Sequence, residues 1–282
     1  MTKKKKNLNK DLKLKMTKNS MKFCLDGEFF DSPEESGIDV NKEEITNPSV
    51  FETLRTYDSH NIFAVEEHLK RLFKSAEILN ITPYATQKTI EESLEKIVKA
   101  NSSPSFDLRI KILLTKDYFW INTQKLISAP EKIYTQGVEV RSETFERPNS
   151  KAKYSSPKYL SFMESLRKEE FEIIFFDNKN FLREGNISNV FAVFGNTIVT
   201  PEERVLHGIT RKKITELIKK DKNLTLEQRE IHQDELQKAD EIFLTNTTKE
   251  IVPVRKWGKW ERQDFTVAQE LRRKFQKSFV IL

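Results

Sequence analysis

Three stretches of the sequence combine residue types that could do chemistry together. Residues 208–210 (Gly-Ile-Thr) open a stretch with the apolar spacing of a helix, and a helix N-terminus with a nearby hydroxyl can hold a phosphate group. Residues 184–186 (Glu-Gly-Asn) precede an apolar run typical of a buried strand, although an ordinary turn has the same pattern. Residues 143–158 contain three lysines, and a lysine amine with a lowered pKa can attack a carbonyl group. Taken singly, each stretch is weak evidence.

The elements that must position these residues begin with a small α+β unit. Residues 22–30 read as a hairpin with Asp26-Gly27 at its turn, a pair that favours a type I′ turn. Further strands and helices follow from apolar spacing with periods of two and about 3.6 residues. The strands are expected at residues 49–57, 108–114 and 118–126, and the helices at residues 65–79 and 86–100. We therefore predict a small N-terminal domain over residues 21–141.

A second unit follows a break in this periodicity. Residues 142–158, with two prolines and four serines, are typical of a domain linker. Beyond them, helices are expected at residues 159–170, 209–219 and 265–279, and strands at residues 172–177, 190–194 and 241–245. Strands and helices alternate without a strict βαβ rhythm, which favours a mixed sheet over a doubly wound one. We predict a larger C-terminal domain over residues 159–282.

Composition and charge exclude several classes of function. The chain has 282 residues and a net charge of +6, but residues 1–20 hold eight lysines and one aspartate, a net charge of +7, which leaves −1 for the rest. We therefore expect a disordered basic tail and no dedicated nucleic-acid surface. One cysteine and four scattered histidines argue against a metal site. With no apolar run of membrane-spanning length and no export signal, we expect a cytoplasmic protein.

Several motifs occur in an order that resembles a known family. They are residues 51–55 (Phe-Glu-Thr-Leu-Arg), 68–72 (His-Leu-Lys-Arg-Leu), 184–191 (Glu-Gly-Asn-Ile-Ser-Asn-Val-Phe), 200–201 (Thr-Pro), 208–211 (Gly-Ile-Thr-Arg), 239–241 (Ala-Asp-Glu), 245–248 (Thr-Asn-Thr-Thr) and 253–254 (Pro-Val). Together they resemble the class IV, fold-type IV family of enzymes that depend on pyridoxal 5′-phosphate (PLP). That family contains branched-chain aminotransferases, D-amino-acid aminotransferases and aminodeoxychorismate lyase. The resemblance covers residues 22–257.

The resemblance implies which residues hold the cofactor. Glu184 would lie against the pyridine nitrogen, because a carboxylate there keeps the nitrogen protonated and the ring able to withdraw electrons. Tyr159 is a candidate partner for the phenolic oxygen, with helix capping as the alternative. The other residues would bind the phosphate group through backbone amides, hydroxyls or a guanidinium. They are Arg71, Ile209, Thr210 and Thr247.

A lysine must form the Schiff base with the cofactor, and three lysines compete for this role. Lys153 lies 31 residues before Glu184, Lys151 lies 33 before it and Lys158 lies 26 before it. The spacing in the family slightly favours Lys151. The local pattern, Ala-Lys-Tyr-Ser-Ser ahead of a helix start, favours Lys153, which we choose.

Substrate contacts are less well defined by the resemblance. Lys111 matches a position where relatives place a basic residue that can meet a substrate carboxylate, and Arg109 lies two residues away on the same strand face. Both have the ordinary role of exposed strand charges as an alternative. Thr248 is a further candidate substrate contact. Many relatives have an aromatic-glycine pair before residue 51, whereas this chain has Thr-Asn-Pro at 46–48, so this wall of the pocket differs.

The family supports two enzyme hypotheses, and a third hypothesis needs no catalysis. The first is an aminotransferase that moves an amino group between an amino acid, branched-chain being one candidate, and a 2-oxo acid. The second is aminodeoxychorismate lyase, which eliminates pyruvate to give 4-aminobenzoate with the same cofactor and lysine. The third is a non-catalytic binding protein, which the complete phosphate site argues against. The resemblance also implies a homodimer.

Overall fold

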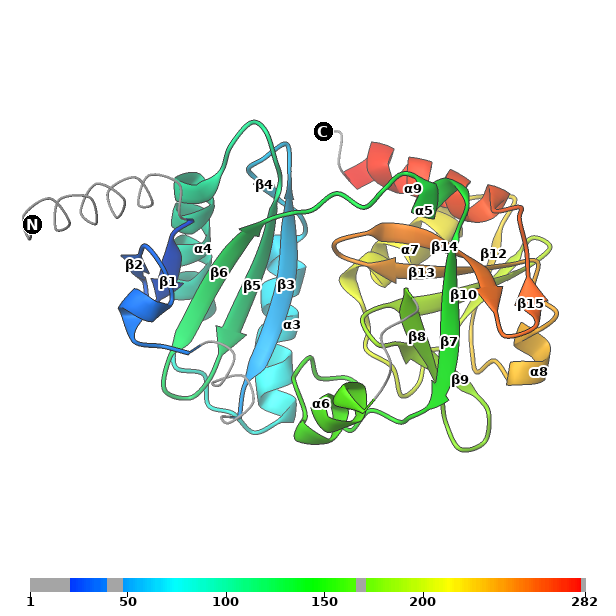
Figure 1. The fold of residues 1–282 in the computed structure, drawn as a ribbon, viewed down its shortest axis with the longest axis horizontal. Coiled ribbons are helices and arrows are strands. Elements are labelled where there is room, and N and C mark those ends of the chain that lie inside the picture. Colours follow the sequence, from blue (N-terminus) through cyan, green and yellow to red (C-terminus); the bar gives the residue numbers. More distant parts are fainter. Residues whose placement is uncertain (1–20, 40–47, 166–170, 280–282) are drawn as a thin grey trace, which may run out of the picture.

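The computed structural model describes residues 21–39, 48–165 and 171–279. Its N-terminal part is a six-stranded antiparallel sheet in the order β2-β1-β6-β5-β3-β4. The strands are β1 (Phe23–Leu25), β2 (Glu28–Phe30), β3 (Val50–Tyr57), β4 (Asn61–Ile62), β5 (Leu108–Leu114) and β6 (Phe119–Lys125). A short 3-10 helix, η1 (Glu34–Ser36), follows β2. Helices α3 (Val65–Ile78) and α4 (Gln87–Asn101) cover one face of this sheet (Figure 1).

Strand β3 has two different faces because its side chains alternate. Leu54 is fully buried in the core that the strand forms with Leu69 and Leu72 of α3. Glu52 points to this same face and is also fully buried. Phe51 and Thr53 point to the opposite face, where they line a pocket. A single strand therefore carries both core residues and pocket residues.

The C-terminal part is a nine-stranded mixed sheet, as the alternation of elements predicted. Its order is β12-β11-β10-β13-β14-β7-β8-β9, with β15 paired to β14. Three of its pairs are parallel, namely β11 with β12, β14 with β7, and β7 with β8. The strands are β7 (Val138–Thr144), β8 (Glu172–Phe176), β9 (Leu182–Gly185), β10 (Asn189–Phe194), β11 (Thr197–Thr200), β12 (Thr225–Gln228), β13 (Glu241–Asn246), β14 (Glu250–Trp257) and β15 (Trp260–Glu261).

Helices pack on this second sheet, and two of them contribute residues to the pocket. They are α5 (Lys132–Thr135), α6 (Pro157–Glu164), α7 (Ile209–Lys220), α8 (Gln233–Leu236) and α9 (Thr266–Phe279). Helices α7 and α9 share an apolar core with strands β10 and β13, in which Phe191 stacks on Phe243 and Phe275 is buried. Helix α6 lies at the edge near the N-terminal sheet (Figure 1). None of the described helices is long and apolar enough to cross a membrane.

The domain limits differ from those expected from the sequence. Strand β7 pairs with β14 and β8, so the expected boundary at residue 141 falls inside a strand of the second sheet. Helix α6 likewise begins at Pro157, inside the expected linker 142–158. We propose instead a boundary within residues 126–131, the segment without regular structure between β6 and α5. The expected basic tail, residues 1–20, lies outside the described residues.

Local turn chemistry explains the first hairpin. Asp26 and Gly27 have φ angles of 52° and 92°, the left-handed values that a type I′ turn requires. Aspartate tolerates this region and glycine adopts it without steric cost. The hairpin predicted from Asp26-Gly27 is confirmed by the pairing of β1 with β2.

Candidate active site

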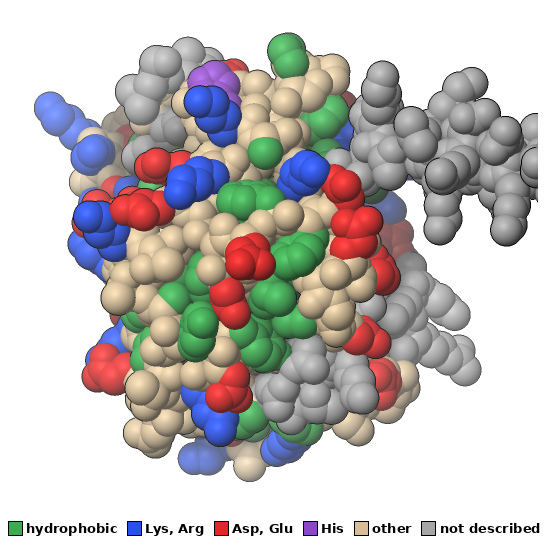
Figure 2. Space-filling model, turned by 90° about the vertical axis from the view of Figure 1, so that its left-hand side faces the viewer, with side chains coloured by type: hydrophobic (Ala, Val, Ile, Leu, Met, Phe, Trp, Pro, Cys, Tyr) green, Lys and Arg blue, Asp and Glu red, His purple; other side chains and the backbone are tan. Residues whose placement is uncertain are grey.

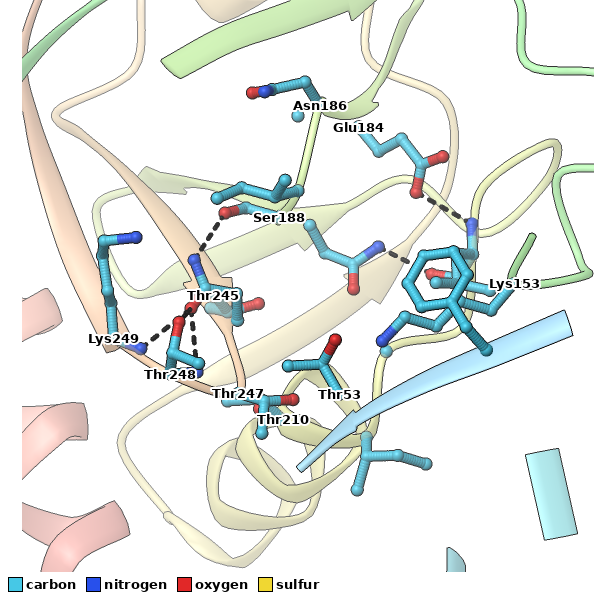
Figure 3. Close-up of a pocket in the computed structure, with 18 of the residues that line it drawn as sticks. Thr53, Lys153, Glu184, Asn186, Ser188, Thr210, Thr245, Thr247, Thr248 and Lys249 are labelled. Carbon is cyan, nitrogen blue, oxygen red and sulfur yellow. Dashed lines mark hydrogen bonds between the residues drawn. The ribbon is translucent and has the colours of Figure 1, made fainter. Parts of the chain in front are cut away.

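A cavity of about 450 Å³ lies between the two sheets and is lined by residues of both. Its size is in the range of pockets that hold small ligands. Strands β3 and β5 form one wall, and the N-terminus of α7 and the turns after β9 and β13 form the other. Figure 3 shows Lys153 and Glu184 on one side of this pocket and the segment from Thr245 to Lys249 on the opposite side. All ten residues assigned to the site from the sequence line this cavity. They are Arg71, Arg109, Lys111, Lys153, Tyr159, Glu184, Ile209, Thr210, Thr247 and Thr248.

Of the three candidate lysines, Lys153 is the one that lines the cavity. Its side chain is 15% exposed, and its Nζ lies 3.4 Å from Glu52 Oε2. Burial lowers the pKa of Lys153 to about 8, and the positive charge of Arg71 adds to this effect while Glu52 opposes it. Lys151 is 55% exposed and pairs with Glu203, so it lies away from the cavity. The rival Lys158 also does not line the cavity. A buried amine with a lowered pKa is suited to nucleophilic attack.

A buried carboxylate, Glu52, connects this lysine to Arg71. Glu52 is fully buried and accepts hydrogen bonds from Arg71 Nε at 2.7 Å and from Arg71 Nη2 at 2.8 Å. His68 Nδ1 lies 2.8 Å from the same carboxylate. Despite its burial, the pKa of Glu52 is lowered well below the usual value because Arg71 and Lys153 stabilise its charged form. The bidentate contact fixes the Arg71 guanidinium at the pocket wall, with Nη1 donating to His207 O at 3.1 Å.

Glu184 has a carboxylate oxygen that no described residue satisfies with a hydrogen bond. Its Oε2 accepts a hydrogen bond from the Leu206 amide at 2.9 Å. Its Oε1 lies 3.2 Å from Arg147 Nε, in an ion pair whose geometry makes no hydrogen bond. Burial raises the pKa of Glu184, and Arg147 opposes that rise. The carboxylate is therefore able to accept a proton or a cationic donor from a bound ligand.

Tyr159 and Arg147 form a polar edge next to this carboxylate. The Tyr159 hydroxyl donates to Asn186 O at 2.8 Å, and the Tyr159 amide donates to Ser156 Oγ at 3.0 Å in the first turn of α6. The Arg147 guanidinium lies over the Tyr159 ring at 4.5 Å from its centroid. Ser156 thus caps the helix, and the Tyr159 ring is left to line the cavity.

The opposite end of the pocket is built to receive an anion. Helix α7 begins at Ile209 behind Gly208, and this N-terminus opens on the cavity. Thr210 Oγ1 is buried and has no hydrogen-bond partner within the described part of the chain. Gly208 leaves no space for a larger residue, because a Cβ there would overlap Asn189 Oδ1. In Figure 3, Thr247 lies on the same side of the pocket as Thr210.

Basic residues line the strand side of the pocket. Lys111 and Arg109 both point into the cavity from β5, as their spacing of two predicted. Lys111 Nζ lies 5.1 Å from the centroid of the Phe51 ring. Thr248 faces them from the turn between β13 and β14, where its amide donates to Asn246 Oδ1 at 3.1 Å. The wall expected to differ from relatives, residues 46–47, lies outside the described residues.

A third buried carboxylate, Glu172, supports the turn after β9. Its Oε1 accepts from the Ile187 amide at 3.1 Å, and its Oε2 accepts from Ser188 Oγ at 2.8 Å. Ser188 Oγ in turn accepts from Asn246 Nδ2 at 3.0 Å, which links the two turns of the C-terminal wall. Burial raises the pKa of Glu172 to about 7. A Cβ at Gly185 would overlap Glu172 Oε1, so a larger residue there requires the Glu172 carboxylate to shift from its hydrogen bonds.

Sequence reasoning gave no role to Glu52, Arg147 or Glu172. Glu52 belongs to the quoted motif 51–55, and its place on the core side of an alternating strand was the available signal: a charged residue at a buried position needs a partner. Arg147 lies in the expected linker, and Glu172 opens a strand that is otherwise apolar. The neighbouring sequence did not indicate a role for either residue, because each contacts residues that are distant in the sequence.

Comparison with known proteins agrees with this geometry. The family model for amino-transferase class IV matches residues 49–257. A branched-chain-amino-acid aminotransferase of Escherichia coli (strain K12) is 31% identical over 235 residues, which cover 73% of this chain and 75% of that protein. A D-alanine aminotransferase of Bacillus licheniformis is 28% identical over 221 residues, covering 73% of this chain and 77% of that one.

Solved structures give the same answer for the fold. The crystal structure of the Escherichia coli branched-chain amino acid aminotransferase matches with a TM-score of 0.80 and 25% identity, over 93% of this chain and 95% of that chain. This likeness confirms the predicted α+β fold of the fold-type IV enzymes. The enzymes of this family depend on PLP. Because the family model spans most of both sheets and the pocket between them, the chain belongs to the class IV aminotransferase family.

Proposed function

We propose that this aminotransferase binds PLP in the cavity between its two sheets and uses Lys153 as the catalytic amine. The observation that carries the proposal is the convergence of three unlike groups in one cavity: a buried lysine with a lowered pKa, a buried carboxylate, and a helix N-terminus. An amine, an acid and an anion site match the aldehyde, the ring nitrogen and the phosphate group of PLP.

The residues of the pocket fit this cofactor. Thr210 Oγ1 is a buried hydroxyl without a partner in the described structure, at the end of the pocket where a phosphate group would find the α7 amides. Glu184 Oε1 is a buried carboxylate oxygen without a hydrogen bond, at the other end. Arg71 would add charge at the phosphate end, because Glu52 already fixes its guanidinium. Thr210 and Arg71 can bind the negatively charged phosphate group of PLP, and Glu184 can bind its protonated ring nitrogen.

When bound, PLP supplies an aldehyde for the amino group and a ring that withdraws electrons from the substrate α-carbon. In the first half of the exchange, Lys153 Nζ would take the proton from the α-carbon of the amino acid. In the second half, it would give a proton to the α-carbon of the 2-oxo acid that receives the amino group. Glu184 would hold a proton at the ring nitrogen. Ile209, Thr210 and Thr247 would fix the phosphate group. Tyr159 would donate to the phenolic oxygen once its hydroxyl turns away from Asn186 O.

The substrates are proposed to be an amino acid and a 2-oxo acid held by their carboxylates. Lys111 and Arg109 supply positive charge on the strand side, and Thr248 supplies a hydroxyl and an amide on the opposite side. The relatives act on branched-chain amino acids and on D-alanine, as their names state, so both classes are candidates. The lyase reaction is not favoured, because the matched relatives are aminotransferases.

A panel assay tests the reaction. Purified enzyme with PLP would be given L-leucine, L-isoleucine, L-valine, D-alanine or L-glutamate together with a matching 2-oxo acid, and both products would be measured. We expect exchange with at least one pair and none with Lys153→Ala, while Lys151→Ala stays active. Release of pyruvate from aminodeoxychorismate without amino-group exchange would replace this proposal with the lyase.

We also propose that the chain works as a homodimer in the cytoplasm. Helices α3 and α4 cover only one face of the six-stranded sheet (Figure 1). Figure 2 shows hydrophobic side chains gathered on the side of the molecule that carries β1 and β2, where Phe29 is 38% exposed. Exposed apolar surface of this kind is typical of a subunit contact. Light scattering of the purified protein would distinguish a dimer from a monomer.

A further inference from the structure

The hairpin between β13 and β14 reaches from the C-terminal sheet toward the N-terminal sheet (Figure 1). Its turn supplies Thr247 and Thr248 to the cavity. The first residue after the turn, Glu250, begins β14 and has a left-handed φ of 62°, which is uncommon for a residue other than glycine. Glu250 is 4% exposed, so its carboxylate is buried. A buried charge in an unfavourable backbone conformation requires strong compensating contacts.

Those contacts come from both halves of the molecule. From β3 of the N-terminal sheet, the Tyr57 hydroxyl donates to Glu250 Oε1 at 2.9 Å and Arg55 Nη1 lies 3.4 Å from the same oxygen. From helix α9 of the C-terminal part, Gln276 Nε2 donates to Glu250 Oε2 at 2.9 Å and Arg272 Nε donates at 3.2 Å. Each carboxylate oxygen is therefore held from a different half.

The same arginine also touches the turn directly. Arg55 Nη1 lies 3.3 Å from Thr248 O, and Arg55 Nη2 lies 3.3 Å from Asp107 Oδ2. Asp107 precedes β5 and accepts the Ser59 amide at 2.9 Å, which anchors the arginine to the N-terminal sheet. The turn is thus tied to the opposite wall of the cavity through Arg55 and Glu250.

We propose that Glu250 is a positioning residue that holds the turn of residues 247–249 against the N-terminal sheet and so sets the substrate-side wall of the active site. It touches neither substrate nor cofactor and acts through Thr248 and Thr247. The inference rests on the proposed function, because the turn matters for catalysis only when the cavity holds the cofactor and the substrates.

Glutamine in place of Glu250 is the informative substitution, since it keeps the size of the side chain. An amide can present only one acceptor oxygen, whereas Glu250 Oε1 faces Arg55 and Oε2 faces Arg272. In either orientation the amide would direct its NH2 group at an arginine, which cannot accept a hydrogen bond. We therefore expect the turn to lose its fixed position. Tyr57→Phe removes one donor and leaves both arginines in place, so we expect it to have a smaller effect than Glu250→Gln.

A matched control separates positioning from stability. Asp177 is 1% exposed and forms a buried pair with Arg183 in the C-terminal part, away from the cavity. Asp177→Asn is expected to lower the melting temperature by a similar amount and to leave KM for both substrates unchanged. Wild type and the three variants would be compared as full chains reconstituted with PLP, by melting temperature, steady-state kinetics and the dissociation constant for PLP.

We expect Glu250→Gln to raise KM for the amino acid about tenfold, with a smaller change in kcat, and to weaken PLP binding severalfold through Thr247. Tyr57→Phe is expected to shift KM in the same direction by less. If Glu250→Gln matched Asp177→Asn, with a lower melting temperature and an unchanged KM, the positioning role would be refuted. If Glu250→Gln did not fold, an unchanged KM in Tyr57→Phe would refute it. Failure of the wild type to bind PLP would instead refute the proposed function.

Discussion

The ionisation of Lys153 in the apoenzyme gives a sharp prediction because it depends on two named neighbours. Burial and Arg71 lower its pKa from 10.5 to about 8, and Glu52 opposes them. At pH 7, the reactive neutral amine would be about 300 times more abundant than for an unperturbed lysine, as a shift from 10.5 to about 8 implies. Glu52→Gln removes the carboxylate that opposes this lowering, so the pKa of Lys153 is expected to fall further.

Competitive acylation of the apoenzyme between pH 6 and 11 would measure this pKa. Trace acetic anhydride would label each lysine according to its neutral fraction, and mass spectrometry would quantify the peptide that contains Lys153. The exposed Lys151 on the same segment serves as the internal reference for reagent access. We expect a midpoint near pH 8 in the wild type and a lower midpoint in Glu52→Gln. A midpoint near 10.5, or an upward shift in the variant, would refute the electrostatic reasoning.

Four further substitutions test other parts of the site. Glu184→Gln is expected to keep PLP bound but to slow amino-group exchange by about 100-fold or more, measured as kcat, because an amide cannot hold the proton on the ring nitrogen. Thr210→Ala is expected to weaken PLP binding about tenfold in a titration of the apoenzyme, since one donor to the phosphate group is lost. Gly185→Ala is expected to cost about 1–3 kcal/mol of unfolding free energy in urea, because its Cβ would overlap Glu172. Glu172 itself, with a pKa raised to about 7, should make the wild type less stable as pH rises from about 4.5 through 7, and Glu172→Gln should flatten that dependence in thermal melts.

Much of the fold could be predicted from the local spacing of apolar residues. Strands β3, β5 and β6 and helices α3, α4, α7 and α9 appear where apolar periodicity placed them, within a few residues. Strand β7 was missed because Val138 and Val140 are its only buried apolar residues and its partners lie far away in the sequence. Pairing over such distances leaves no mark in the neighbouring residues. Because β7 was not predicted, the expected domain boundary at residue 141 fell inside it.

The site residues were predicted from several motifs taken together. Gly208 before an amphipathic helix and Glu184 before a buried strand are weak signals singly, and the order of the motifs along the chain, which resembles a known family, singled them out. The choice among the three lysines rested on a short pattern, and Lys153 is the lysine that the fold places in the cavity. The partners of the site residues were not predictable. Glu52 and Glu250 act through contacts between strands and helices that are brought together only by packing.

The central claim is that Lys153 is the amine that reacts with PLP, and covalent mapping tests it most directly. The purified protein would be loaded with PLP and scanned for the visible absorption band that gives the bound cofactor its yellow colour. It would then be reduced with borohydride and digested for mass spectrometry. The account predicts a single reduced pyridoxyl group on Lys153, and no band in Lys153→Ala. A label on Lys151 or Lys158, or no band in the wild type with excess PLP, would contradict it.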